Sequence, residues 1–266
     1  MKHSILHKTV YHYDEPVSYA LQKVRLHPVS GPGQSVADWQ VGVQGGQIEA
    51  SYRDHYGNHV DLVSADTGTS DLVIEARGEV EVTSSDGVLG KVYTRAPLWH
   101  FCSATALTAA DEGIEALGKH AADHPGGVLA GLHEMSAQIL KQVPYETGAT
   151  TTDTSAQDAM RLGKGVCQDH SHIFIAAARA AGVPARYVSG YLYMPDRTDQ
   201  DASHGWAEAH IDGLGWTGFD VSNQISPDEK YIRIAIGCDA RDATPIAGMR
   251  VGAGASSMIV SLQVQQ

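Results

Sequence analysis

Alternation of apolar and polar residues, the pattern of β-strands, dominates the first hundred residues of the chain. Turn signals such as Tyr56-Gly57-Asn58 separate the alternating segments. The expected strands cover residues 5–13, 24–28, 39–43, 48–52, 59–63 and 72–82. Short strands at this spacing favour an antiparallel, sandwich-like β domain.

The spacing of apolar residues becomes helical after about residue 100. It predicts helices over 108–117, with Thr108 as N-cap, and over 128–143. Thr154 and Gln157 fit the capping box of a short third helix, which should end near the glycines at positions 163 and 165.

A fourth helix should begin near Cys167 and end at Gly182, because Pro184 forbids its continuation. Strands are then expected over 185–193, 204–211, 216–221, 231–237 and 258–264, with a polar loop at 195–203 and a turn at 212–215. The chain is therefore expected to be an α+β protein. We expect a β-rich unit over 1–100 and a mixed unit over 101–266.

Composition narrows the class of protein. The chain has 266 residues, of which 42% are hydrophobic and 19% charged, as in a folded globular protein. A net charge of −12 argues against a nucleic-acid partner, since phosphate binding needs a basic surface. Residues 1–10 lack the apolar core of a secretory signal, and no stretch has the length of a membrane span. We therefore expect a cytoplasmic protein with no membrane partner.

Three widely spaced cysteines, Cys102, Cys167 and Cys238, form neither a disulfide framework nor a CxxC zinc motif. Fourteen histidines leave a metal site open, but no HExxH motif supports one. We expect no metal and no cofactor.

Cys167 lies where a glycine-rich turn meets a helix start. Unpaired backbone N–H groups and the helix dipole favour a thiolate there, and the same N–H groups can bind an oxyanion. Gln168 and Asp169 make its surroundings polar. A buried, inert thiol is the commoner fate of a lone cysteine, so position alone leaves a nucleophile and an inert thiol equally supported.

A cysteine nucleophile needs a base with an orienting partner. His204 opens one expected strand and Asp220 lies near the end of the next. The two side chains lie on the same face of the hairpin if the residue numbers of directly opposed positions add up to an even number, such as 424 or 426. A loop of three residues with a glycine in the left-handed conformation gives such a register. His170 and His172 lie too close to Cys167 along one helix to reach over its sulfur, and His210 lies near the turn.

Several segments resemble a known family. GVCQDHSH, AAGVPARYVSGYL and SHGWAEAHIDGLGWTGFDVSN resemble the bacterial transglutaminase-like superfamily of papain-type thiol enzymes. YHYDEPVSYALQKVRLHP and DHYGNHVDL resemble the β-rich domain that precedes the core in this family. The resemblance implies an N-terminal antiparallel β-sandwich-like domain and a papain/transglutaminase-like core, with helices packed on an antiparallel sheet.

The resemblance also implies roles for individual residues. Cys167 matches the nucleophile, His204 the general base and acid, and Asp220 the residue that orients the histidine. Three more residues match positions for oxyanion or substrate binding, namely Tyr145, Gln168 and Trp206. For Trp206, as for Glu208, we expect hairpin packing and support of the site rather than chemistry.

The chain departs from the family pattern at four positions. Gly205 stands where alanine is common and Val221 where proline is common. Cys238 and Ala240 stand where the family has arginine and tyrosine. We expect the effects of Gly205 and Val221 to be mild.

The sequence thus predicts a thiol enzyme that acts on amide or peptide bonds through a thioester, most simply a cysteine peptidase or amidase. The alternatives are transfer to an amine, as in a protein-glutamine gamma-glutamyltransferase, a non-catalytic peptide-binding protein, and a metal-dependent hydrolase. The expected partners are a peptide or protein substrate and, for transfer, an amine acceptor.

Overall fold

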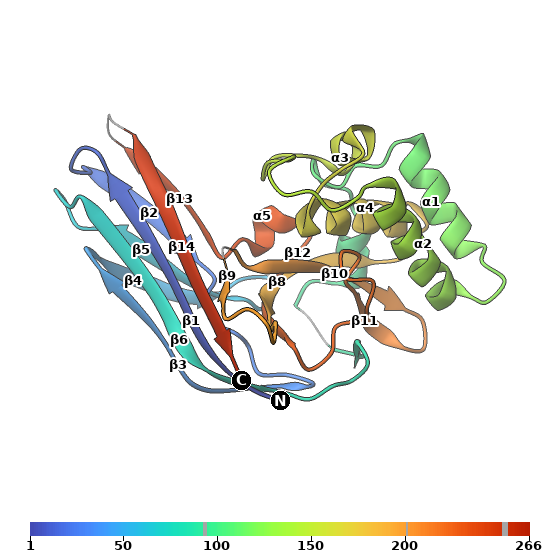
Figure 1. Ribbon diagram of the computed structural model, residues 1–266, viewed down its shortest axis with the longest axis horizontal. Helices are drawn as coiled ribbons and strands as arrows, with labels where there is room; N and C mark the ends of the chain where they lie inside the picture. Colours follow the sequence, from blue (N-terminus) through green and yellow to red (C-terminus); the bar gives the residue numbers. More distant parts are fainter. Residues whose placement is uncertain (93–94, 201, 252–254) are drawn as a thin grey trace.

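Long antiparallel strands form one side of the molecule, and helices on a second antiparallel sheet form the other (Figure 1). The computed structural model describes residues 1–92, 95–200, 202–251 and 255–266. Among these residues no helix is long and apolar enough to cross a membrane. The mixed α+β class expected from the sequence is confirmed.

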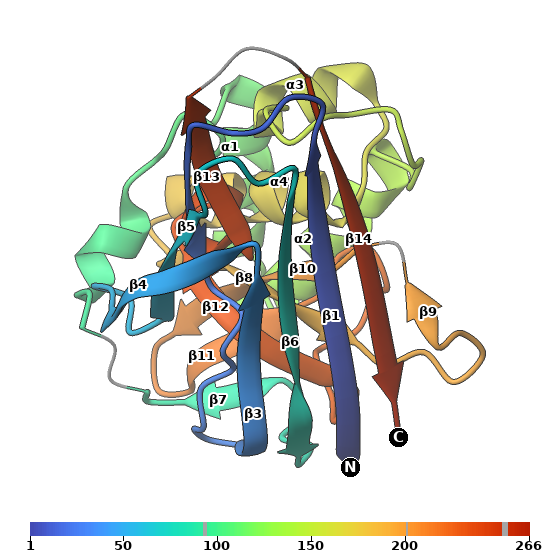
Figure 2. The same ribbon diagram turned by 90° about the vertical axis from the view of Figure 1, so that its left-hand side faces the viewer.

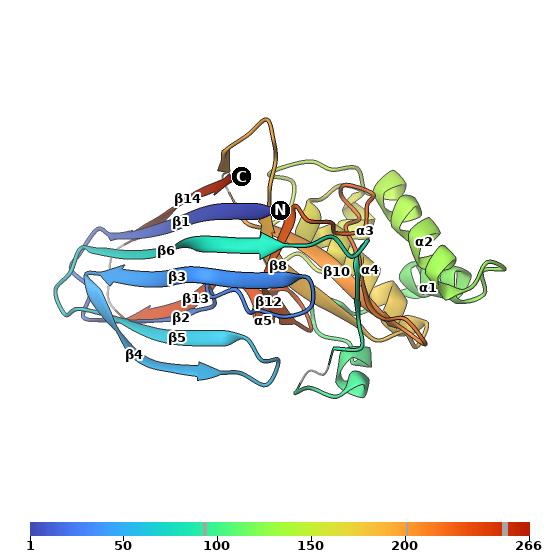
Figure 3. The same ribbon diagram turned by 90° about the horizontal axis from the view of Figure 1, so that it is seen from below.

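Two sheets make up the strand-rich side, in the orders β3-β6-β1-β14-β9 and β13-β2-β5-β4. Figures 2 and 3 show them as two layers of long strands. Their bounds are β1 Lys2–Tyr13, β2 Tyr19–Val24, β3 Gln34–Gln44, β4 Gly46–Arg53, β5 His59–Ala65, β6 Asp71–Val82, β9 Asp199–Gln200, β13 Ile246–Val251 and β14 Ser256–Gln265. Buried Val24 and Val63 of one sheet join Leu72 and Ile74 of the other in a single core, as in a sandwich.

The second side has a sheet in the order β12-β8-β10-β11-β7, on which helices pack. Its strands are β7 Val88–Gly90, β8 Ala185–Leu192, β10 His204–Ile211, β11 Gly215–Phe219 and β12 Tyr231–Gly237. The helices are α1 Glu112–Ala122, α2 Val128–Gln142, α3 Ala156–Leu162, α4 Cys167–Ala180, the short α5 Ala240–Ala243 and the 3-10 helix η1 Leu98–Cys102. Eleven consecutive buried residues, 169–179, make α4 the central helix of this side.

Strand pairing crosses the boundary expected near residue 100. β14 pairs with β1, and β13 pairs with β2, so the last twenty residues complete the first two sheets. β7 pairs in turn with β11 of the second side. The division into units at residue 100 remains a prediction, and Asp201 of the expected polar loop lies outside the described residues.

Two helix starts differ from those expected. α1 begins at Glu112, because Asp111 accepts a hydrogen bond from the Ile114 N–H, whereas Thr108 is buried and accepts one from Arg179. α3 is capped by Ser155, one residue after the expected Thr154. The ends of α3 and α4 are as expected, with Gly163 and Gly182 in the left-handed conformation after them. The expected end of the first helix at Leu117 is wrong, because α1 continues to Ala122.

Some short elements were not expected. These are β7, β9, β13, η1 and α5. The strand expected over 24–28 is wrong, because β2 ends at Val24 and the segment after it is irregular. Leu26 is nevertheless buried, and its carbonyl accepts a hydrogen bond from the Trp39 indole at 2.9 Å, so the alternation there reflects packing of a loop.

A tight turn between β4 and β5 docks one side on the other. The Asn58 side chain exchanges two hydrogen bonds with the backbone of Ile236 on β12, at 2.8 and 2.9 Å. The Tyr56 hydroxyl donates to Asp242 at 2.6 Å. This turn therefore anchors the strand-rich side to the edge strand of the second sheet.

Candidate active site

The start of α4 holds Cys167 at a polar, partly exposed position. The N-cap, Val166, is extended, and its N–H donates to the Asp169 carboxylate at 2.8 Å. Thr150 donates to the same oxygen at 2.7 Å. Gly165 makes room for this arrangement, because a Cβ there would lie 2.8 Å from the Asp169 side chain. The glycine-rich turn thus lets Asp169 fold back and fix the helix start that carries the thiol.

The β10–β11 hairpin places His204 next to Asp220. Ile211 opposes Gly215 across a loop of three residues, so opposed positions sum to 426. This register puts the two residues on one face as a diagonal pair. The His204 Nε2 lies 2.7 Å from Asp220 Oδ2. The hairpin geometry expected from the two glycines of the turn is confirmed.

Charge interactions strongly favour the imidazolium form of His204. Burial alone lowers its pKa, but hydrogen bonds with Asp220 and Cys167, and the charges of both, raise the pKa to about 10. Because Nε2 faces Asp220, Nδ1 is the ring nitrogen left for the thiol. The structure therefore joins imidazole and carboxylate directly and places Cys167 close enough to influence the same imidazole.

Asp220 has further partners that the sequence did not reveal. Tyr231 donates to its Oδ2 at 2.7 Å, and the Asn223 side chain donates at 2.7 Å. Burial raises the pKa of Asp220, and the hydrogen bonds from His204, Asn223 and Tyr231 outweigh that effect and keep the pKa below its ordinary value. The spacing Asp220-Val-Ser-Asn223 is a turn signal that could have indicated Asn223. Tyr231 comes from β12, and no local signal points to it.

Tyr145 lies beside the cysteine turn, as the resemblance implies. It forms a parallel bridge with Gly165, and the neighbouring Glu146 N–H donates to the Gly165 carbonyl at 2.8 Å. Burial raises the pKa of the Tyr145 phenol, and so do the nearby charges of Cys167 and Asp220. The side chain is 51% exposed, so its hydroxyl remains a free donor at the open edge of the site.

Gln168 and Trp206 occupy supporting positions. The Gln168 amide donates to the Thr152 carbonyl at 3.2 Å and so ties α4 to the loop before α3. Trp206 is 1% exposed and stacks on His204 at a ring distance of 6.2 Å. Burial leaves Trp206 little surface for a substrate, in line with the expected support of the site. A direct role of either residue in binding stays a prediction.

The competing histidines are held elsewhere. His170 bonds to Ser222 and to the carbonyl of Val143, and burial lowers its pKa. His172 accepts a hydrogen bond from the Ala240 N–H, and burial lowers its pKa to about 3. His210 packs edge-on against Trp216. Neither His170 nor His172 nor His210 shares Asp220 with His204 in a hydrogen bond.

Gly205 matters more than the sequence suggested. A Cβ at this position would lie 2.0 Å from the hydroxyl oxygen of Tyr187 on the adjacent strand β8. Tyr187 is buried, and its pKa is raised well above the ordinary value by burial and by the charges of Cys167 and Asp169. The departure at Gly205 therefore makes room for a neutral phenol next to His204, and the expected mild effect stays a prediction.

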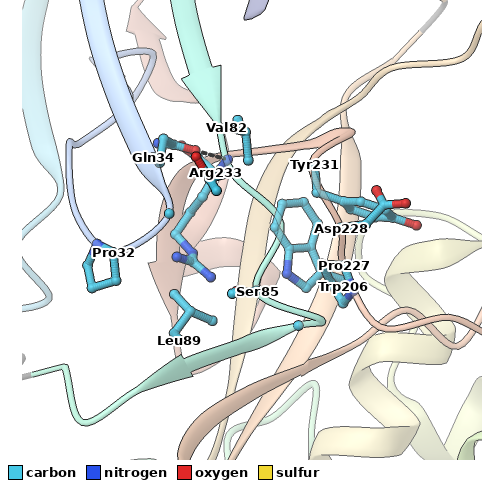
Figure 4. A pocket seen from close by; sticks show the side chains of 13 residues that line it. Pro32, Gln34, Val82, Ser85, Leu89, Trp206, Pro227, Asp228, Tyr231 and Arg233 are labelled. Carbon is cyan, nitrogen blue, oxygen red and sulfur yellow. Dashed lines mark hydrogen bonds between the residues drawn. The ribbon is translucent and has the colours of Figure 1, made fainter. Parts of the chain in front are cut away.

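A small cavity of about 40 Å³ lies behind the site, between the two sides of the molecule. Figure 4 shows it between Trp206 and Tyr231 on one flank and Gln34 and Arg233 on the other. Its lining includes none of Cys167, His204 and Asp220. This cavity is therefore not part of the cysteine site.

The arrangement can carry out nucleophilic acyl chemistry. It offers a thiol at a helix N-terminus, an imidazolium next to it and a buried carboxylate behind that. Of the described residues, only His27, His59 and Asp61 form a cluster with metal-ligand geometry, and none of these three belongs to this site.

Comparison with known proteins agrees with the fold and the site. Residues 3–81 match the model of the bacterial transglutaminase-like N-terminal region, and residues 121–221 match that of the transglutaminase-like superfamily. The chain belongs to the transglutaminase-like superfamily and carries the bacterial N-terminal region in front of its core.

Similar proteins span nearly the whole chain. An uncharacterized protein of Mycobacterium leprae is 27% identical over 98% of this chain and 97% of its own length. A protein-glutamine gamma-glutamyltransferase of Pseudomonas aeruginosa is 31% identical, but over 36% of this chain and 15% of its own length. The crystal structure of a proposed cysteine protease from Cytophaga hutchinsonii superposes with a TM-score of 0.76, at 23% identity, over 100% of this chain and 90% of that one. This likeness confirms the fold.

Proposed function

We propose that the protein is a cysteine-dependent enzyme that cleaves an amide or peptide bond through a thioester on Cys167. The observation that carries the proposal is the contact of His204 with Asp220 at 2.7 Å, because it raises the pKa of His204 and so favours an imidazolium near the Cys167 sulfur. A thiolate is the nucleophilic form of cysteine.

The first half of the reaction forms the thioester. The Cys167 sulfur adds to the substrate carbonyl carbon, and the helix N-terminus, with Tyr145 as a second donor, stabilises the resulting oxyanion. The C–N bond then breaks, and the leaving nitrogen takes a proton from His204. Asp220 keeps the imidazole oriented during this transfer.

The second half releases the acyl group. His204 takes a proton from water, the hydroxide attacks the thioester carbonyl, and the C–S bond breaks to regenerate the thiolate and the imidazolium. We favour hydrolysis because the sulfur and Tyr145 lie at an open edge, where water competes with any acceptor.

Transfer to a primary amine is the second candidate. It follows the same first half and ends with an amide instead of a carboxylate. The likeness to the gamma-glutamyltransferase of Pseudomonas aeruginosa over 105 residues favours keeping it in the test.

Mass spectrometry tests the proposal directly. The protein is incubated with a peptide library and a primary amine in ¹⁸O-labelled water, and both intact protein and products are measured. We expect an acyl adduct on Cys167, which is absent from Cys167→Ala. ¹⁸O in the product carboxylate indicates hydrolysis, and an amine adduct indicates transfer.

Alkylation by iodoacetamide near neutral pH tests the thiol itself. Cys102 is a fair internal reference, because it is partly exposed like Cys167. We expect Cys167 to react faster, and His204→Ala to remove the difference. Equal rates for the two cysteines would overturn the proposal, as would activity that survives Cys167→Ala.

A further inference from the structure

A compact cluster of two histidines and a carboxylate lies on the strand-rich side, away from Cys167. His59 and Asp61 stand two apart on β5 and therefore share a face of the strand. His27 follows β2, the strand that pairs with β5. The Nε2 atoms of His27 and His59 each lie 2.9 Å from a different oxygen of Asp61. Two segments that lie far apart in the sequence thus converge on one carboxylate.

The donor atoms have the chemistry and spacing of a metal site. All three ligand atoms lie within 4.8 Å of one another. Imidazole nitrogen and carboxylate oxygen bind zinc at about 2.0–2.2 Å, which places neighbouring donors of a tetrahedral site about 3.3 Å apart. The two N···O separations of 2.9 Å therefore need only a small expansion to admit an ion.

We propose that His27, His59 and Asp61 bind a divalent transition-metal ion, with Zn²⁺ as the ion best suited to this donor set. Each imidazole binds through Nε2 with its proton on Nδ1. The Asp61 side chain is 2% exposed, while those of His27 and His59 are 25% and 29% exposed. The ion therefore lies at the surface, anchored from below by the carboxylate and open to a fourth ligand from solvent.

A hydrogen bond from a neighbouring strand also fixes the orientation of the Asp61 carboxylate. The Ser51 hydroxyl donates to its Oδ1 at 2.5 Å from the neighbouring strand β4. A hydrogen bond of this kind orients a ligating carboxylate. The centroids of the two imidazole rings lie 4.1 Å apart with their planes tilted by 40°, so the rings pack against one another beside the carboxylate.

A second group of the same residue types provides a comparison within the chain. Glu134 lies between His120 and His124, at 3.2 and 3.1 Å. Within the described part of the chain, however, it does not meet the mutual spacing that the first cluster meets. His120 and Glu134 are also largely exposed. This group of three residues therefore serves as a control, because its histidine–carboxylate contacts lack the spacing of a metal site.

The position of the cluster suggests what the ion does. His59 directly follows Asn58, which anchors the β4–β5 turn to β12. An ion that links His59 to His27 fixes the start of β5 next to that anchor. We infer a stabilising site at the junction of the two sides of the molecule, which no step at Cys167 requires.

The test uses untagged protein that carries Cys167→Ala, since a thiolate also binds zinc. Co²⁺ absorption and Zn²⁺ calorimetry measure affinity and stoichiometry, and thermal unfolding measures stabilisation. We expect one equivalent of ion and a rise in melting temperature. His27→Gln and His59→Gln should each weaken binding at least tenfold, whereas His120→Gln should bind like the parent.

Several outcomes would overturn the site. These are absence of binding to the folded parent at micromolar ion, parental affinity in both His27→Gln and His59→Gln, and loss of the ion in His120→Gln. Circular dichroism checks the fold of each variant, and His27, in a loop, keeps the test valid if His59→Gln does not fold. Activity is not the readout, so failure here leaves the proposal for Cys167 untouched.

Discussion

Asp220 sets the charge of the histidine that faces Cys167. It holds His204 at 2.7 Å, and its own charge is kept by hydrogen bonds from Asn223 and Tyr231. The imidazolium therefore persists through neutral pH, because the pKa of His204 is raised to about 10. Removing the carboxylate charge removes a main cause of that raised pKa.

Asp220→Asn should lower the pKa of His204 by about 1 to 3 pH units, since an adjacent opposite charge contributes about that much. The sign follows from the charge: the imidazolium loses its stabilising anion, so it gives up its proton at lower pH. NMR titration of labelled histidine from pH 5 to 11 measures the midpoint. Asp228→Asn, which removes a carboxylate not bonded to His204, should leave it unchanged. If the titration midpoint of His204 is unchanged in Asp220→Asn, Asp220 is not a cause of the raised pKa of His204.

Gly205 and Tyr187 pack so closely that a Cβ at position 205 would overlap the Tyr187 hydroxyl. Gly205→Ala should lower the free energy of unfolding by about 1–3 kcal/mol, because its Cβ overlaps the Tyr187 hydroxyl. Urea unfolding measures the loss, which should shrink in Tyr187→Leu. Gly42→Ala, at a strand glycine with open space around it, is the matched control. Equal stability of Gly205→Ala and Gly42→Ala would refute the clash.

At the scale of elements, β1 is joined to β8 by a buried histidine. The Nδ1 of His7 lies 2.8 Å from the Tyr191 hydroxyl, and burial lowers the pKa of His7 to about 4. The folded state therefore binds fewer protons than the unfolded state between pH 6.5 and about 4. Stability from this group is present above pH 6.5 and is lost as the pH falls through that window.

In His7→Gln, the free energy of unfolding should fall less steeply as the pH is lowered from 6.5 to about 4. Wild-type protein should lose up to about 1.4 kcal/mol per pH unit through this histidine, and the variant should not. Urea unfolding at several pH values between 7 and 4.5 gives the two slopes. His55→Gln, at an exposed position, should keep the wild-type slope. Parallel curves for His7→Gln and wild type would rule out this contribution.

Elements with local signals were predictable from the sequence. The hairpin register followed from the glycines of a three-residue loop, and the end of α4 from Gly182. Local signals failed where a contact with a residue far away in the sequence determines the structure. Thr108 resembles a helix cap, but its hydroxyl accepts a hydrogen bond from Arg179 instead. β13 lies at a sheet edge, beside β2 from the other end of the chain, and no nearby residue predicts that pairing.

The same distinction holds for the site. Cys167, His204 and Asp220 were visible because a helix start and one hairpin position them. Tyr231 and Tyr187 were missed, since they reach the site from β12 and β8 through sheet order rather than sequence spacing. The ligand cluster around Asp61 was missed for the same reason, because His27 comes from a different segment.

At the scale of the whole molecule, the two sides depend on a small number of buried polar contacts. Asn58→Ala should cost about 1–3 kcal/mol, because it leaves the buried N–H and carbonyl of Ile236 without partners. Urea unfolding measures the cost. Gln47→Ala, at an exposed position of the same sheet, should have little effect. A cost no larger than that of the control would mean that this turn does not anchor the two sides.

The pairing of β14 with β1 affects the order in which the protein can be made. Ser4 lies opposite Gln265, so β1 leaves the ribosome before β14, the strand that covers one of its edges. Until then one edge of a twelve-residue strand is open to pairing with other chains. A nascent chain that stalls short of residue 256 therefore exposes an aggregation-prone edge of β1.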